Sequence, residues 1–167
     1  MTKPGIHVCR ADYGRNDHAA AVVSLLDAYA RDPMGGSEAL SDFAKSNLVA
    51  ALAARPQAYS VLAFCGADGL QTPVGLVNCI EGFSTFACRP LVNVHDVVVL
   101  DGYRGQRVAE NMLALAEQIA RERGACKLTL EVLQGNEGAI RLYQRIGFAN
   151  YQLDPAMGHA QFWQKWL

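Results

Sequence analysis

A strand, a turn and a helix follow one another within residues 93–109, and this order constrains the fold more than any other part of the sequence. Residues 94–100 form a β-branched and apolar run, which predicts a strand too short to cross a membrane. Asp101 and Gly102 supply turn chemistry. The next segment repeats apolar residues at helical spacing, and these are Val108, Met112, Leu115, Ala116 and Ile119. Because the first amides of a helix lack carbonyl partners and carry the positive end of its dipole, this arrangement predicts an anion-binding site.

Cationic and small residues surround the predicted anion site. The segment 103–109, Tyr-Arg-Gly-Gln-Arg-Val-Ala, resembles the acetyl-CoA pyrophosphate loop of the GNAT superfamily of N-acetyltransferases, whose pattern is Q/R-x-x-G-x-G/A. Arg104 matches the first position and Ala109 matches the last, whereas Arg107 replaces the central glycine. Without the resemblance, the same residues would form a tight turn that leads into a helix.

Arg107 is expected in the first turn of the helix, where φ is negative and any L-residue fits without strain. Its guanidinium would then project past the phosphates and add a contact to them.

A second motif lies at 136–148, where the sequence resembles the GNAT segment N-x-x-A-x-x-(L/F)-Y-x-x-x-G-F. Asn136 and Ala139 match positions beside the cofactor, and Tyr143 matches the tyrosine near its sulfur. The structural alternative is an Asn-capped helix with an aromatic anchor and a glycine stop.

The expected elements alternate between the two types of secondary structure. In the first half of the chain they are a strand at 6–10, a helix capped by Asp12 or Asn16, a helix capped by Ser37 or Ser41, and strands at 59–65 and 74–80 joined by turn residues at 66–69 and 71–73. The central strand and its helix follow, and after them come a strand at 126–132, a helix at 136–146, and closing strands at 148–153 and 160–166. This order predicts an α/β fold with one mixed, mostly antiparallel sheet flanked by helices, in a single domain over 1–167. It is the order of GNAT folds, with a right-handed crossover after the central strand.

Composition excludes several other classes of protein. Hydrophobic residues make up 51% and charged residues 19%, as in ordinary globular domains, and the net charge of -1 gives no reason to expect nucleic acid or a membrane as a partner. The 5 cysteines lack any C-x-x-C spacing, and the 4 histidines (His7, His18, His95 and His159) are dispersed, so no metal site is expected. Residues 1–4 are followed by no long apolar segment, and we expect a cytoplasmic protein.

The resemblance implies that an amine attacks acetyl-CoA in a ternary complex. It assigns Tyr143 as the acid that protonates the leaving thiolate, His95 as the candidate base and Asp96 as the second candidate. It also places the cofactor against the strand backbone, the loop and the first helical turn, which are Val97, Val98, Val99, Arg104, Gly105, Gln106, Arg107, Val108, Ala109 and Glu110.

The acceptor stays open at this level. Residues 103–105 are also similar to the spermidine/spermine N-acetyltransferases, which suggests a polyamine or diamine and a homodimer. Candidate carboxylates for a cationic acceptor are Asp32, Glu38, Asp42, Glu81 and Asp96. The alternatives are an acetyltransferase for a protein amine, a non-catalytic acyl-CoA sensor, and a nucleotide-binding domain, which the lack of a G-x-G-x-x-G motif disfavours.

Overall fold

A computed structural model describes residues 5–66, 71–158 and 160–167 of the chain. Residues 1–4, most of the predicted turn at 66–69, and His159 therefore lie outside the described residues. The chain forms two compact units, Met1–Leu130 and Glu131–Leu167, which we call the sheet unit and the C-terminal unit.

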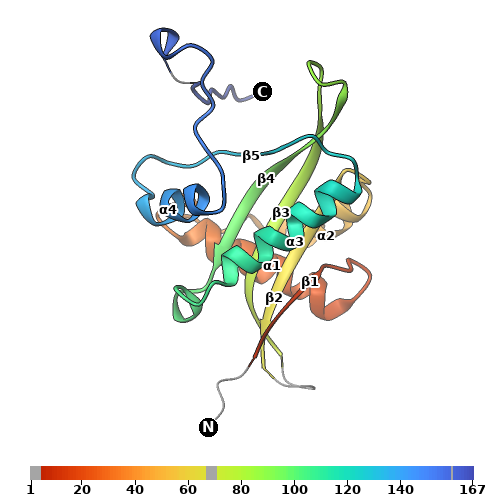
Figure 1. Cartoon of the computed structure of the whole chain (residues 1–167). Helices are drawn as coiled ribbons and strands as arrows, with labels where there is room; N and C mark the ends of the chain where they lie inside the picture. Colours follow the sequence, from red (N-terminus) through yellow and green to blue (C-terminus); the bar gives the residue numbers. More distant parts are fainter. Residues whose placement is uncertain (1–4, 67–70, 159) are drawn as a thin grey trace. The chain divides into compact units, whose positions relative to one another are not determined.

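The sheet unit contains one sheet with helices on both faces (Figure 1). Its elements are β1 (Ile6–Arg10), α1 (Asn16–Arg31), α2 (Asp42–Ala53), β2 (Ala58–Cys65), β3 (Thr72–Ser84), β4 (Arg89–Val99), the short 3-10 helix η1 (Asp101–Tyr103), α3 (Val108–Glu122) and β5 (Leu128–Leu130). The strands lie in the order β1-β2-β3-β4-β5. Neighbours from β1 to β4 are antiparallel, and β4 and β5 are parallel. The predicted mixed, mostly antiparallel sheet is confirmed.

Each face of the sheet is covered by helices of a different part of the chain. Figure 1 shows α3 in front of the sheet and α1 behind it. Behind the sheet, buried residues of α1 pack on apolar side chains of three strands, and this cluster comprises Ala21, Val22, Leu25, Leu62, Phe64, Leu76 and Val98. Fully burying one large apolar side chain stabilises the fold by roughly 1.5–3 kcal/mol, so this cluster is a main source of stability.

In front of the sheet, α3 lies directly on the backbone of β3. A Cβ atom added to Gly75 would lie 2.8 Å from Met112 Cε. The Tyr59 hydroxyl, on the same face, donates a hydrogen bond to the carbonyl oxygen of Ala116 at 2.9 Å. These contacts fix α3, and therefore its N-terminus, against the centre of the sheet.

The helix caps agree only partly with the prediction. Ser41 caps α2 by accepting from the Ala44 amide. Ser37 lies in a turn with φ 61. For α1 the prediction of Asp12 or Asn16 is wrong, because Arg15 is the N-cap and makes no side-chain cap bond. The Asp12 carboxylate instead accepts from the Gly14 amide, in the turn that precedes the helix.

Two strand lengths differ from the prediction. The hairpin of β3 and β4 extends to Ser84 and Arg89 at its turn, well beyond the predicted strands at 74–80 and 94–100. In contrast, β5 contains only Leu128–Leu130 of the predicted strand at 126–132. The long hairpin is stabilised by its own ladder, whereas β5 has a partner over only three residue pairs.

The C-terminal unit contains α4 (Glu137–Arg145) and a short 3-10 helix, η2 (Pro155–Met157). Asn136 caps α4, and Gly147 follows the helix with φ +99, both as predicted. The predicted closing strands at 148–153 and 160–166 are wrong, because none of their described residues is in a strand. A strand needs a partner for its ladder and a surface for its apolar face. Here those side chains are exposed, for example Leu153 at 81% and Trp163 at 80%.

Candidate active site

The loop between β4 and α3 carries two residues with left-handed backbone. Gly105 has φ +74, and Arg107, the N-cap of α3, has φ 61 and ψ 18. The prediction that Arg107 lies in the first helical turn with negative φ is therefore wrong. The chain enters α3 through one left-handed residue, and this requirement explains why the GNAT pattern has glycine at that position. An arginine there costs on the order of 1–2 kcal/mol of backbone strain.

The first turn of α3 directs its free amides toward this loop. The Asn111 amide donates to the Arg107 carbonyl oxygen at 3.0 Å, and the amides of Val108 and Ala109 precede this bond at the start of the helix. The predicted anion site at this helix N-terminus stays a prediction.

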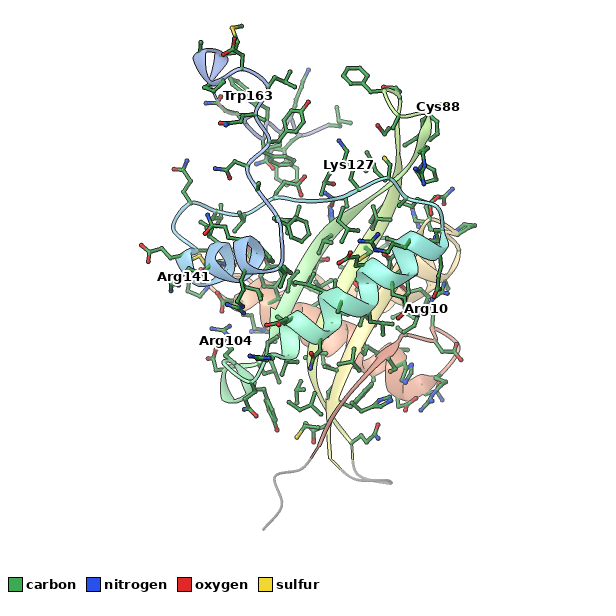
Figure 2. The ribbon with its side chains drawn as sticks, viewed as in Figure 1. Arg10, Cys88, Arg104, Lys127, Arg141 and Trp163 are labelled. Atoms are coloured by element: carbon green, nitrogen blue, oxygen red, sulfur yellow. The ribbon has the colours of Figure 1, made fainter. Side chains whose placement is uncertain are left out.

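Arg104 ties this loop to the neighbouring strand and to the end of α1. Its Nε donates to the Val99 carbonyl oxygen at 3.0 Å, and its Nη2 donates to Asp32 Oδ2 at 3.2 Å. Its Nη1 also lies 2.8 Å from Asp101 Oδ1. Figure 2 shows Arg104 at this loop, at the other end of the sheet from Cys88 in the β3–β4 turn. The side chain thus braces the loop, and its predicted contact with a cofactor stays a prediction.

One edge of β4 is open beside that loop. The parallel partner β5 pairs with β4 only at Val92, Asn93 and Val94. From 96 to 99, β4 pairs with β3 on one side, and no described strand of the sheet unit pairs with it on the other. An open strand edge offers a row of backbone donors and acceptors to an extended ligand. This is the geometry that the predicted role of Val97, Val98 and Val99 requires.

The open segment begins at a β-bulge. Asn78 pairs with Asp96 and Cys79 pairs with Val94, so His95 is an extra residue in β4. The His95 side chain is exposed, and its Nδ1 lies 3.2 Å from Asn93 Oδ1. Bulges redirect side chains in this way beside functional sites.

Asp96 lies on the α1 face of the sheet and is half-buried. Its Oδ2 accepts a hydrogen bond from Asn78 Nδ2 at 3.0 Å. The structure therefore separates the two candidate bases, with His95 in solvent and Asp96 between the sheet and α1.

Tyr29, near the C-terminal end of α1, completes a small polar group that sequence reasoning missed. Burial raises the pKa of Tyr29, and the negative charges of Asp96 and Asp32 raise it further. The pKa of Asp32 itself is lowered, first by the hydrogen bond from the Met34 amide and then by Arg104. The only signal in the sequence was that Tyr29 lies three residues ahead of Asp32, just before a glycine turn.

The remaining candidate carboxylates lie elsewhere. Glu81 forms an ion pair with Arg123 of α3 at 3.2 Å. Glu38 and Asp42 are exposed, and Asp42 opens α2. Of the five carboxylates proposed from the sequence, Asp32 and Asp96 are therefore the two that face Tyr29.

The second motif forms α4 as predicted. The Asn136 side chain accepts from the Ala139 amide at 3.2 Å. Tyr143 is 9% exposed and makes an edge contact with Phe148, with ring centroids 5.9 Å apart. The roles of Asn136, Ala139 and Tyr143 beside the cofactor stay predictions.

A search of the described residues finds no group of three or more His, Cys, Asp or Glu side chains that could hold a metal ion. Within the same residues, every helix is too short or too polar to span a membrane.

In this geometry, the segment of β4 beyond the reach of β5 leads through the loop into the N-terminus of α3. The family model described as the acetyltransferase (GNAT) family matches residues 22–148. The chain belongs to this family.

Several acetyltransferases are similar to this chain in sequence or in fold. The chain is 37% identical over 87 residues to a streptothricin acetyltransferase of Streptomyces lavendulae, an alignment that covers 50% of this chain and 46% of that protein. A crystal structure of a probable acetyltransferase matches with a TM-score of 0.74 at 24% identity, over 87% of this chain and 91% of the other. An aminoglycoside N-acetyltransferase in complex with CoA matches with a TM-score of 0.71 at 14% identity, over 97% of this chain and 95% of the other. The chain spans less than half the length of the curated relatives it matches.

Proposed function

We propose that this protein transfers the acetyl group of acetyl-CoA to a primary amine of a small cationic acceptor, by direct attack in a ternary complex. The observation that carries the proposal is the continuity of the open β4 edge with the amide cradle of α3. Family membership supports the reaction type.

On the cofactor side, the backbone of residues 97–99 pairs with the pantetheine arm as an added strand. The pyrophosphate lies against the amides of residues 108–110 and is rimmed by Gly105, Gln106 and Arg107. Asn136 and Ala139 lie beside the cofactor in this proposal, as the second motif implies.

On the acceptor side, Asp96 and Asp32 receive the ammonium groups, and Tyr29 lies beside them. Two carboxylates in one place favour an acceptor with more than one amine. A polyamine or diamine satisfies this requirement. The descriptions of similar proteins add streptothricin and aminoglycosides as candidates.

The chemistry has three proton transfers. A lysine-like amine with a pKa of ~10.4 is protonated at neutral pH, and its deprotonation costs roughly 4–5 kcal/mol. His95, exposed at the bulge, takes that proton directly or through water and passes it to solvent. The free amine attacks the thioester carbonyl, a C–N bond forms and a tetrahedral oxyanion with a positively charged nitrogen results. Its collapse breaks the C–S bond, and Tyr143 gives its phenolic proton to the departing thiolate. The nitrogen of the new amide loses its extra proton, which returns to the Tyr143 phenolate. Exposed β4 amides stabilise the oxyanion.

Two other functions remain as alternatives. A non-catalytic acyl-CoA sensor is favoured by the left-handed Arg107, since the cradle is strained where the family has glycine. Acetylation of a protein amine is supported by the fold match to a ribosomal-protein-alanine N-acetyltransferase of Brucella melitensis. We also propose that residues 1–167 act as one domain, as a cytoplasmic homodimer.

The test is a thiol-release assay with acetyl-CoA and a panel of diamines, streptothricin-type compounds, aminoglycosides and peptide N-termini. We expect turnover with at least one small amine, and a large loss of kcat/KM in Asp96→Asn with acetyl-CoA affinity retained. Binding of CoA without turnover on any amine would favour the sensor. Turnover restricted to peptides would favour a protein acceptor.

A further inference from the structure

Four polar side chains form a continuous hydrogen-bonded chain across the α1 face of the sheet. Ser60, Asn78 and Asp96 are direct cross-strand partners on β2, β3 and β4. Tyr13, in the connection between β1 and α1, reaches the first of them. The distances are 2.8 Å from Tyr13 Oη to Ser60 Oγ, 2.5 Å from Ser60 Oγ to Asn78 Oδ1, and 3.0 Å from Asn78 Nδ2 to Asp96 Oδ2.

The middle of this chain is deeply buried. Ser60 is 1% exposed and Asn78 is 4% exposed, and the next row of the same face consists of Leu62, Leu76 and Val98. A hydroxyl and an amide in such a place must be hydrogen-bonded, because burial without a partner costs on the order of 1–3 kcal/mol for each group. If these positions served only to fill the core, apolar residues would be sufficient, as they are in the next row.

The donors of the chain all point toward Asp96. An ionised carboxylate can only accept, so Asn78 must turn its NH2 group to Asp96 and its carbonyl oxygen to Ser60. The Ser60 hydroxyl then donates to Asn78, and its own oxygen accepts from the Tyr13 hydroxyl. Bonds aligned in one direction polarise one another, so the series of bonds holds the Asp96 carboxylate from one side.

The other titratable groups near Asp96 are few. From α1 it faces Tyr29, whose pKa is raised by burial, so that the phenol is neutral at neutral pH. The neighbour on β4 is His95, whose side chain is exposed.

We propose that Tyr13, Ser60 and Asn78 are positioning residues that hold the Asp96 carboxylate in one orientation, aimed at the point where it meets the ammonium group of the acceptor. The inference rests on the proposed function, in which Asp96 binds that ammonium. A carboxylate without such support rotates about its χ angles, and small displacements of a substrate-orienting group have large effects on rate.

The test compares three variants, each of which deletes one hydroxyl that is hydrogen-bonded at a face of the sheet. Tyr13→Phe and Ser60→Ala break the series of hydrogen bonds that leads to Asp96. Tyr59→Phe is the matched control, because the Tyr59 hydroxyl donates to the Ala116 carbonyl oxygen on the opposite face. We expect all three to lower the unfolding temperature. Only the first two should lower kcat/KM, by about 3- to 30-fold.

The decisive comparison uses Asp96→Asn as the parent. There, Tyr13→Phe and Ser60→Ala should have no further effect on kcat/KM. An undiminished loss in that background, or an equal loss in Tyr59→Phe, would overturn the proposal.

If the proposed function fails, the hydrogen-bonded series from Tyr13 to Asp96 can still be tested by stability measurements. If no amine is acetylated, the urea midpoint of Tyr13→Phe is measured with Asp96 and with Asn at position 96. If the hydrogen bonds from Tyr13 to Asp96 act together, Tyr13→Phe should lower the urea midpoint less in the Asp96→Asn background, because the charged acceptor has gone. Equal losses of midpoint in the two backgrounds would refute this coupling independently of any activity.

Discussion

Replacement of Arg107 by glycine should stabilise the protein and weaken its hold on CoA. The residue has φ 61 in the turn that starts α3 and makes no side-chain cap bond. Glycine removes a backbone strain on the order of 1–2 kcal/mol. Glycine also raises the conformational entropy of the unfolded chain, and this cancels about 0.4–1 kcal/mol of the stabilisation. The net gain is about 0.5–1 kcal/mol, or roughly 1–4 °C in unfolding temperature for a chain of this size.

The guanidinium of Arg107 has a separate effect on the cofactor. If it contacts a phosphate of CoA, its loss weakens binding by roughly 1–2 kcal/mol, less at high salt. Arg107→Ala keeps the strain and removes the charge, so it should bind CoA as weakly as Arg107→Gly without the gain in stability.

The assays are thermal unfolding and calorimetric titration with CoA at two salt concentrations. Gly105→Ala is the reverse control, since φ is +74 and no atom lies within 4 Å of an added Cβ, so its cost is backbone strain alone. A lower unfolding temperature for Arg107→Gly would refute the strain argument. Tighter CoA binding by that variant would refute the phosphate contact and favour the sensor.

Four further predictions follow from the same structure. Tyr143→Phe should lower kcat by about 10- to 10³-fold with little change in acetyl-CoA affinity, and unchanged turnover would remove the phenol from the mechanism. His95→Gln should abolish the ascending limb of kcat/KM near neutral pH, whereas persistence of the limb would move the role to another group. A backbone amide lowers the pKa of Asp32, so its contribution to stability is present above about pH 4 and is lost as pH falls through the lower folded value. Asp32→Asn should therefore flatten the acid side of the stability curve in urea titrations, and an unaltered slope would contradict this. Gly75→Ala should destabilise by about 1 kcal/mol in urea, because its Cβ would lie 2.8 Å from Met112 Cε, and no loss would mean that the methionine shifts freely.

The sequence predicted the elements whose signals are local. Apolar spacing located α1 and α3, and the serine or asparagine ahead of a helical pattern located Ser41 and Asn136 as caps. The strand–turn–helix order was enough to place an anion cradle ahead of Val108, since that site is made of backbone.

Features that depend on contacts between distant parts of the sequence could not be predicted in the same way. Arg107 has a left-handed φ where the chain passes from η1 into α3, and its residue type indicated the opposite. The residues at 160–166 include three aromatic residues, as strands often do, yet a strand needs a partner that composition does not supply. The chain through Ser60 and Asn78 requires the register of three strands. The sequence did contain one sign of the bulge. Valines occupy even positions at Val92 and Val94, and the alternation continues on odd positions at Val97 and Val99.

The bulge at His95 leaves the pairing of β3 and β4 on both sides of it intact. Val94 opposite Cys79 and Asp96 opposite Asn78 already occupy consecutive rungs of β3. Excision of the single residue between them would leave every other rung in place and give β4 an unbroken alternation. The residue is thus an insertion that the architecture tolerates and does not require. What it adds is a basic ring in solvent one step before a half-buried acid, at a point where a continuous strand would offer the acid alone.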